Sequence, residues 1–305
     1  MKNLYKNTQI FRCIHESHQN FKHKISVYHI LKEKACYPHG CIYFCWRCKQ
    51  LNKKKVCHRG YSHVGRKCFG CRDFYEEKIH NYPELQIAED EFRKFRSEYE
   101  LFEEWIEERQ HKPVEFSSRI NNIKPHFIKK EYPKTQFLSF KGFILVFKDI
   151  FIDRWHFEDS VYGLISADHL KRLNIGTDSE IEGQAYLKVD QGRLILSRFR
   201  GLEILQTGAP LVWDEAATQL ARKTATEFSV QSEGCLQCPY GALLDVEYYK
   251  DHHSHSRRKL FCLKGMADFR NCYVRADYCG LDREADDLPQ DKCKFEPEIN
   301  IYSGF

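Results

Sequence analysis

Apolar residues recur in alternating steps of three and four over residues 84–110, and this is the most regular pattern in the chain. The positions are Leu85, Ala88, Phe92, Phe95, Tyr99, Phe102 and Ile106. This periodicity predicts an amphipathic helix, with Pro83 at its first position and Pro113 beyond its end. At 1.5 Å per residue the helix would be about 38 Å long. We therefore expect it to bridge two domains, with its aromatic seam packed inside the chain.

Short runs rich in β-branched and aromatic residues follow, separated by glycines. The runs cover residues 120–128, 137–152, 161–166, 181–189 and 193–204. Residues 167–173 predict a short helix between the third and fourth runs, and Asp190-Gln191-Gly192 predicts a hairpin loop. Five strands with this helix indicate a small β-barrel, OB-like in order, although an SH3-like barrel or a small sandwich would give a similar pattern.

The last third of the chain predicts a helix over residues 214–226, capped by Asp214. Two further apolar runs, 242–249 and 257–263, indicate strands joined by the polar loop 250–256. Cysteines surround these runs, and we expect four of them to form a metal site, with Cys279 as a substitute for the last. The expected ligands are Cys235, Cys238, Cys262 and Cys272.

The elements together predict an α+β, multidomain protein. Two small Cys-rich metal-bound modules would flank a bridging helix and a small OB-like β-barrel. The expected divisions are a basic, zinc-ribbon-like module in 1–82, the amphipathic helix in 83–112, the barrel in 113–210, and a helix with the C-terminal metal module in 211–305.

Cysteine spacing adds chemistry to the first module. Cys45 with Cys48 and Cys68 with Cys71 are two C-x-x-C pairs, and 19 residues separate them. This spacing is typical of a four-thiolate zinc site, in which each pair directs two sulfurs to one ion at roughly 2.3 Å. We therefore expect these four cysteines to bind Zn²⁺.

The same module contains further potential metal ligands. A second N-terminal metal could be held by Cys36, Cys41, Cys57 and His58. The same thiols could instead hold a 4Fe-4S cluster, which also needs four thiolates.

Residues 11–34 add Cys13 and a group of histidines. We expect this segment to pack beneath the metal module, although imidazoles are also common zinc ligands. The histidines are His15, His18, His23 and His29.

The balance of charge differs between residues 1–80, which are basic, and residues 84–110, which are acidic. Residues 1–80 carry 17 Lys and Arg against 5 Asp and Glu, whereas residues 84–110 carry 4 against 10. Basic side chains on a metal-bound loop can neutralise phosphates, and nearby aromatic rings can stack on unpaired bases. The candidate nucleic-acid contacts are Trp46, Arg47, Lys49, Lys53, Lys54, Lys55, Arg59, Arg66, Lys67 and Arg72.

The predicted barrel offers a second candidate surface. Its basic and aromatic residues are Lys141, Phe143, Phe147, Lys148, Arg154, Trp155, Arg193, Arg198 and Arg200. Because residues 143–147 are apolar at every position, we expect that run to be buried. Only Arg193, Arg198 and Arg200 are expected to face outward, where they would contact a single-stranded backbone.

The sequence carries no phosphate-binding glycine loop, no G-x-S-x-G elbow and no H-E-x-x-H motif, so a non-catalytic role is favoured. It has no signal-peptide pattern and no apolar run near the roughly 20 residues of a membrane span. Clustered, knuckle-spaced cysteines favour a reducing, intracellular location such as the cytoplasm.

The leading hypothesis is a metal-stabilised protein that binds RNA or single-stranded DNA, as a non-catalytic subunit of a larger nucleoprotein assembly. One alternative is an iron–sulfur protein acting in electron transfer or as an accessory redox subunit. Another is a scaffold that binds a protein partner through helix 84–110, with Phe95 and Phe102 in the contact.

Overall fold

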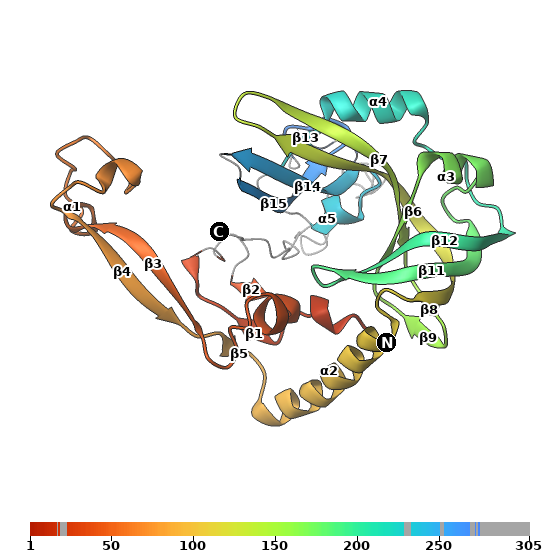
Figure 1. Cartoon of the computed structure of the whole chain (residues 1–305), viewed down its shortest axis with the longest axis horizontal. Helices are drawn as coiled ribbons and strands as arrows, with labels where there is room; N and C mark the ends of the chain where they lie inside the picture. The colour runs from red at the N-terminus through yellow and green to blue at the C-terminus, as the bar shows by residue number, and fades with distance from the viewer. Residues whose placement is uncertain are drawn as a thin grey trace, which may run out of the picture.

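The computed structural model describes residues 1–16, 18, 23–228, 233–250, 253–268, 272 and 274. It is a mixed α+β structure, built mostly of sheet with few helices (Figure 1). Cys279, the expected substitute ligand, lies outside the described residues. Among the described helices, none combines the length and the apolar character needed to cross a membrane.

The amphipathic helix is α2 (Glu89–Arg109), which begins later than the predicted start near Pro83. The preceding residues form β5 (Glu84–Leu85), which pairs with β1 (Phe11–Arg12), while β1 also pairs with β2 (Lys24–Ile25). The Ala88 N–H donates to Glu91 Oε2 at 3.3 Å and closes the first turn. Strand pairing with a distant segment therefore overrides the helical periodicity at Leu85.

The aromatic seam of α2 is packed inside the chain, as expected. Tyr5, from the short helix η1 (Leu4–Lys6), lies edge-on to Phe102 with ring centroids 5.0 Å apart. Phe95 and Phe102 are buried within the chain, and the binding of a protein partner through this helix remains a prediction. The buried seam also includes Trp105, which the predicted series omitted.

Five strands are linked by a ring of backbone pairings. They are β6 (Pro113–Glu131), β7 (Gln136–Phe147), β10 (Val161–Ile165), β11 (Glu180–Asp190) and β12 (Arg193–Gln206). The pairings run β6, β7, β10, β12, β11 and return to β6, and only β10 with β12 is parallel. Helix α3 (Ala167–Leu173) lies between β10 and β11, and the loop after Asp190 joins β11 to β12, so both predictions are confirmed.

Alternating side chains of β7 fill the inside of this ring. Phe143, Leu145 and Phe147 are buried, whereas Ile144 and Val146 between them are half-buried on the outer side. The predicted strand 137–152 ends at Phe147, because a turn divides it from β8 (Ile150–Ile152).

A glycine allows β7 to approach the end of β10 closely. Gly142 has φ +115°, and a Cβ there would lie 2.4 Å from the carbonyl oxygen of Ile165. A larger residue would therefore collide with the β10 backbone.

The C-terminal strands continue the same sheet. Helix α4 (Glu215–Thr224) is capped by Asp214, whose Oδ1 accepts the Ala217 N–H at 2.6 Å, as predicted. After β13 (Thr226–Glu227) and α5 (Glu233–Gln237), β14 (Gly241–Lys250) pairs with β15 (His253–Cys262). The predicted hairpin is confirmed, but its strands extend into the expected loop 250–256.

β14 also pairs in parallel with β6, so the C-terminal hairpin is joined to the ring. One buried apolar cluster extends from Tyr5 to Leu263. The division of the chain into four separate modules remains a prediction.

A two-stranded ribbon extends away from the ring (Figure 1). It consists of β3 (Cys41–Cys48) and β4 (Phe74–Asn81), with α1 (Lys49–Asn52) and the 3-10 helix η4 (Arg66–Cys68) at its outer end. We call residues 41–81 the arm. The buried apolar clusters of the described chain contain no residue of the arm. Because isolated two-stranded ribbons are marginally stable in water, the arm needs another source of stability.

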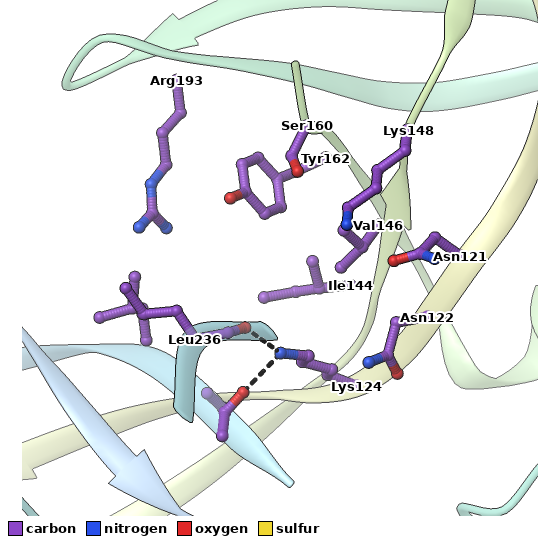
Figure 2. A pocket seen from close by; sticks show the side chains of 13 residues that line it. Asn121, Asn122, Lys124, Ile144, Val146, Lys148, Ser160, Tyr162, Arg193 and Leu236 are labelled. Carbon is purple, nitrogen blue, oxygen red and sulfur yellow. Dashed lines mark hydrogen bonds between the residues drawn. The ribbon is translucent and has the colours of Figure 1, made fainter. Parts of the chain in front are cut away.

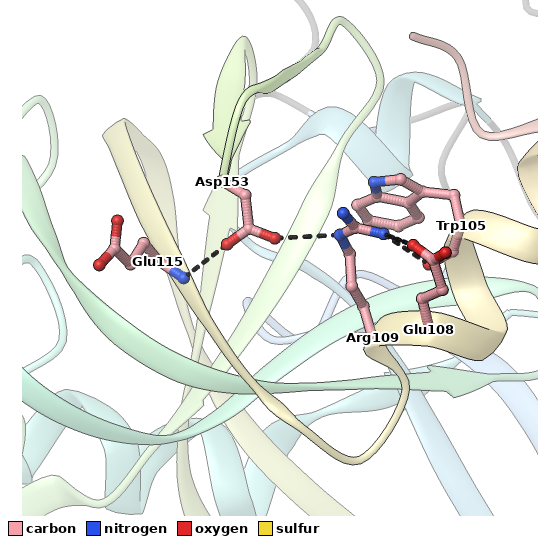
Figure 3. Close-up of polar contacts among 5 residues, drawn as sticks. All are labelled: Trp105, Glu108, Arg109, Glu115 and Asp153. Atoms are coloured by element: carbon pink, nitrogen blue, oxygen red, sulfur yellow. Dashed lines mark hydrogen bonds and ion pairs between the residues drawn. The ribbon is translucent and has the colours of Figure 1, made fainter.

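Arg109, at the C-terminal end of α2, contacts Asp153 next to the ring (Figure 3). Its Nε donates to Asp153 Oδ2 at 3.0 Å, and its guanidinium lies 5.1 Å from the Trp105 ring. Asp153, in the turn between β8 and β9 (Trp155–Phe157), also accepts the Glu115 N–H at 3.0 Å. One carboxylate thus joins α2, the turn and the start of β6.

Alanine at Asp153 is expected to lower the free energy of unfolding by about 1–2 kcal/mol, because charge-assisted hydrogen bonds to two segments are lost. Asp149 provides a matched control, since both residues have positive φ, but its side chain is 72 % exposed and lies 3.6 Å from His156. Alanine there should change stability by less than about 0.5 kcal/mol. Equal losses in urea unfolding would assign the effect to the backbone and contradict a role for the Arg109 contact.

Candidate metal centre and nucleic-acid interface

Four cysteines line one small cavity at the outer end of the arm. They are Cys48, Cys57, Cys68 and Cys71, around a space of about 10 Å³. Cys48 ends β3, and the Cys71 N–H donates to the Cys68 carbonyl at 2.9 Å, which forms the second knuckle. The Arg59 N–H donates to Cys57 Sγ at 3.4 Å. We call these four residues the tip site.

His58 and Asp73 bring nitrogen and oxygen ligand atoms to the same place. Atoms of His58, Cys71 and Asp73 lie within 4.8 Å of one another, and no other described group of three or more such residues does so. His58 Nδ1 is 3.9 Å from Asp73 Oδ2. Because the four sulfurs are farther apart than in a bound zinc site, an ion would have to draw them together.

Cys45 was predicted to share a metal with Cys48, Cys68 and Cys71, but it is not among the cysteines that line the tip cavity. Cys45 and Cys48 are three residues apart on an extended strand, so their side chains leave opposite faces of β3. Burial raises the pKa of the Cys45 thiol, and Glu16 beside it raises that pKa further. Cys57 takes the fourth place in the tip site instead.

The structure does not bring together the four residues of the predicted second N-terminal site. Cys57 and His58 belong to the outer end of the arm. Cys41 begins β3 at the other end of the ribbon, where it pairs with Asn81, and Cys36 precedes it. The eight-residue length of β3 separates the two halves of the proposed site.

Three of the four expected C-terminal ligands lie near one another. Cys235 packs against the small cluster that contains Cys262, and Cys262 is among the groups that raise the pKa of the Cys238 thiol, after burial. The Tyr240 N–H donates to Cys238 Sγ at 3.5 Å. Cys272 as the fourth ligand remains a prediction.

Most of the predicted basic contacts on the arm are exposed. The exposed residues are Lys49, Lys53, Lys54, Lys55, Arg59, Arg66, Lys67 and Arg72. Arg47 is different, because it forms ion pairs with Glu77 at 2.8 Å and Glu16 at 2.9 Å. Two carboxylates neutralise its guanidinium, so we remove Arg47 from the candidate phosphate contacts.

Apolar side chains are exposed on one face of β3. Ile42, Phe44 and Trp46 alternate along this face and are 54, 60 and 40 % exposed. Phe69 lies edge-on to Trp46 with ring centroids 4.8 Å apart and is also exposed. Exposed aromatic rings beside a basic loop form the kind of platform on which unpaired bases stack.

A second candidate site lies on the outer side of the ring (Figure 2). Residues of β6, β7, β10 and β12 face α5 and the start of β14 across a cavity of about 120 Å³. The described lining residues include three cations, Lys124, Lys148 and Arg193, and one tyrosine, Tyr162, and no carboxylate is among those described. We call this the ring cavity.

The cations of the ring cavity are held in different ways. Lys124 Nζ donates to the carbonyl oxygens of Leu236 and Gly241, both at 2.7 Å, and burial lowers the pKa of Lys124 to about 8. The Arg193 guanidinium lies 5.1 Å from the Tyr162 ring. Arg193 Nε has no hydrogen-bond partner in the described chain. The cavity therefore combines cationic side chains, the Arg193 Nε donor without a partner in the described chain, and the aromatic ring of Tyr162.

Arg193 was expected to be exposed, but it is 8 % exposed and lies within this cavity. Arg198 and Arg200 are exposed, as expected, and both lie over the Tyr186 ring at 5.6 Å. They do not line the ring cavity.

Lys124 and Tyr162 were missed in the sequence. Tyr162 could have been found from the alternation of Val161, Tyr162 and Gly163, which places the tyrosine on the outer face. Lys124 carries no such signal, because its burial depends on contacts with α5 and β14 more than a hundred residues away.

Comparison of the chain with protein families, curated proteins and solved structures gave no match. A functional proposal therefore depends on this chain's own side chains.

Proposed function

We propose that the chain binds RNA or single-stranded DNA, as a metal-stabilised, non-catalytic subunit of a larger nucleoprotein assembly. In this proposal the five-strand ring is an OB-like barrel. The order of its pairings and the position of α3 support this assignment. OB-folds bind oligonucleotides on the face of their second and third strands, which correspond to β7 and β10.

The observation that carries the proposal is the composition of the ring cavity. Its cations Lys124, Lys148 and Arg193 surround outward-facing residues of β7 and β10, with no carboxylate among the lining residues that the structure describes. A phosphate oxygen would accept a hydrogen bond from Arg193 Nε, which has no partner in the described chain. Tyr162 and the apolar Ile144 provide a surface for a base or sugar.

The arm provides a second contact in this proposal. Its exposed lysines would neutralise phosphates, and Phe44, Trp46 and Phe69 would stack on bases. A metal at the tip site would hold the lysine-bearing loop in one conformation. The tip-site residues Cys48, Cys57, Cys68 and Cys71 are free cysteines, which supports a reducing compartment such as the cytoplasm.

The donors at the tip site support Zn²⁺ in this proposal, with a 4Fe-4S cluster as the alternative. Four thiolates, with an imidazole and a carboxylate beside them, are donors that zinc accepts.

Glutamine at Lys53, Lys54 and Lys55 together is expected to weaken binding of a labelled unpaired oligonucleotide. The slope of log affinity against log salt should fall by about 2, because each phosphate contact on a single strand contributes about 0.7. Fluorescence anisotropy at several salt concentrations measures this slope.

The matched control replaces Lys171, Arg172 and Lys223, which are exposed on α3 and α4. It removes the same charge, and its slope should stay close to that of the unmodified protein. Equal reductions in both variants would indicate general attraction to a positive protein and contradict a specific contact through the arm.

A further inference from the structure

We propose that Cys13, Cys36 and Cys41, with His18 as an imidazole ligand, bind a divalent metal ion of the zinc type at the base of the arm. The four residues come from the segment after β1, from the turn before β3 and from the first position of β3. We call them the base site. It lies at the opposite end of β3 from the tip site, and its function is independent of nucleic-acid binding.

Contacts through Asn81 bring two of the thiols together. Asn81 ends β4 opposite Cys41, and its Nδ2 donates to Cys13 Sγ at 3.1 Å and to Cys41 Sγ at 3.8 Å. Cys36 shares a side-chain hydrogen bond with Cys41. Cys13 and Cys36 are 1 and 5 % exposed. Three free thiols, those of the buried Cys13 and Cys36 and the half-buried Cys41, therefore lie near one another, and two of them contact the Asn81 amide.

The backbone at Cys13 resembles that at two other candidate ligands. The His15 N–H donates to the Cys13 sulfur, just as Arg59 does to Cys57 and Tyr240 does to Cys238. In each case the donor is two residues after the cysteine. Such hydrogen bonds favour the thiolate form, which is the form that binds a metal.

His18 has the properties of a metal-binding imidazole. Its side chain hydrogen-bonds to the backbone of Cys13, and it is 4 % exposed. Its Nδ1 is buried and has no hydrogen-bond partner in the described chain. A ring held by a backbone contact on one nitrogen, with the other nitrogen unused, is the usual arrangement of a histidine ligand.

Charge explains why an ion is needed. Cys13 and Cys36 are almost fully buried, and burial disfavours thiolates that have no compensating positive charge. A divalent cation would compensate the thiolates that burial disfavours. The sulfurs do not yet lie within 4.8 Å of one another, whereas sulfurs around zinc are about 3.8 Å apart. Binding must therefore draw them together.

The test is the zinc content of the purified full-length chain, measured by mass spectrometry of the metal. Cys13→Ser and Cys41→Ser are each expected to reduce the content by one ion per chain, and so is His18→Gln. Cys45→Ser is the matched control, because it removes a thiol from the same strand outside both arm sites and should leave the content unchanged. Far-UV circular dichroism confirms that each variant is folded.

Full zinc content in the folded Cys13 and Cys41 variants would overturn the base site. Loss in those variants with full content in His18→Gln would overturn the assignment of His18 alone. Oligonucleotide affinity is measured on the same samples, so a failure of the nucleic-acid proposal would be seen separately from the metal count.

Discussion

Serine at both Cys48 and Cys71 is expected to unfold the arm while the ring stays folded. The arm contributes no residue to the described apolar clusters, so we expect a metal at the proposed tip site to contribute most of the stability of its outer end. Structural zinc contributes on the order of 10–16 kcal/mol to the folding of small metal-dependent modules. Hydrogen exchange should therefore lose its protection over residues 41–81 and keep it in β6, β7 and β12. Removal of metal with a chelator should give the same pattern.

Serine at Cys45 is the control for this result, because Cys45 lies outside the tip site. In this Cys45 variant, the backbone amides of the arm should remain protected from hydrogen exchange in the presence of zinc. An arm that remains protected in the double variant, or after complete removal of metal, would contradict a metal-dependent fold.

Glutamine at Arg193 is expected to weaken oligonucleotide binding by about 10- to 150-fold, since a hydrogen bond to a charged group is worth about 1.5–3 kcal/mol. The effect should be large because Arg193 is 8 % exposed and, within the described part of the chain, faces a cavity lined by no carboxylate and has an Nε without a hydrogen-bond partner. Anisotropy titration at fixed salt measures the loss. Lys148→Gln provides a second variant on the same cavity that leaves the contact between Arg193 and Tyr162 intact.

Arg198→Gln removes the same charge from an exposed residue over Tyr186. It should reduce affinity by no more than about threefold, because it lies outside the cavity and acts only through screened charge. Similar losses for Arg193→Gln and Arg198→Gln, with thermal stability unchanged, would show that the ring cavity is not the binding site.

Local patterns predicted the elements whose residues are close in the sequence. The aromatic series of α2 was recognisable because one helical face is buried, and Asp214 was recognisable as a helix cap. The helix α3 and the loop after Asp190 were found for the same reason. Each depends on neighbours within a few residues.

Contacts between distant segments could not be predicted in this way. Leu85 continues the helical series but pairs with Phe11 instead. The C-x-x-C spacing of Cys45 and Cys48 suggests a shared metal, but on an extended strand the two thiols point to opposite faces. Cys57, from a loop, lines the tip cavity with Cys48 instead. In the sequence Arg47 resembles a phosphate contact, whereas in the structure it forms ion pairs with Glu16 and Glu77.

The most direct test of nucleic-acid binding is a salt titration of the zinc-loaded chain with a labelled oligonucleotide of about 20 nucleotides. We predict preferential binding to the single strand over its duplex, with log affinity falling by about 3 or more per unit of log salt between about 50 and 200 mM. Binding that does not depend on salt, or no detectable binding at the lowest salt, would contradict this prediction.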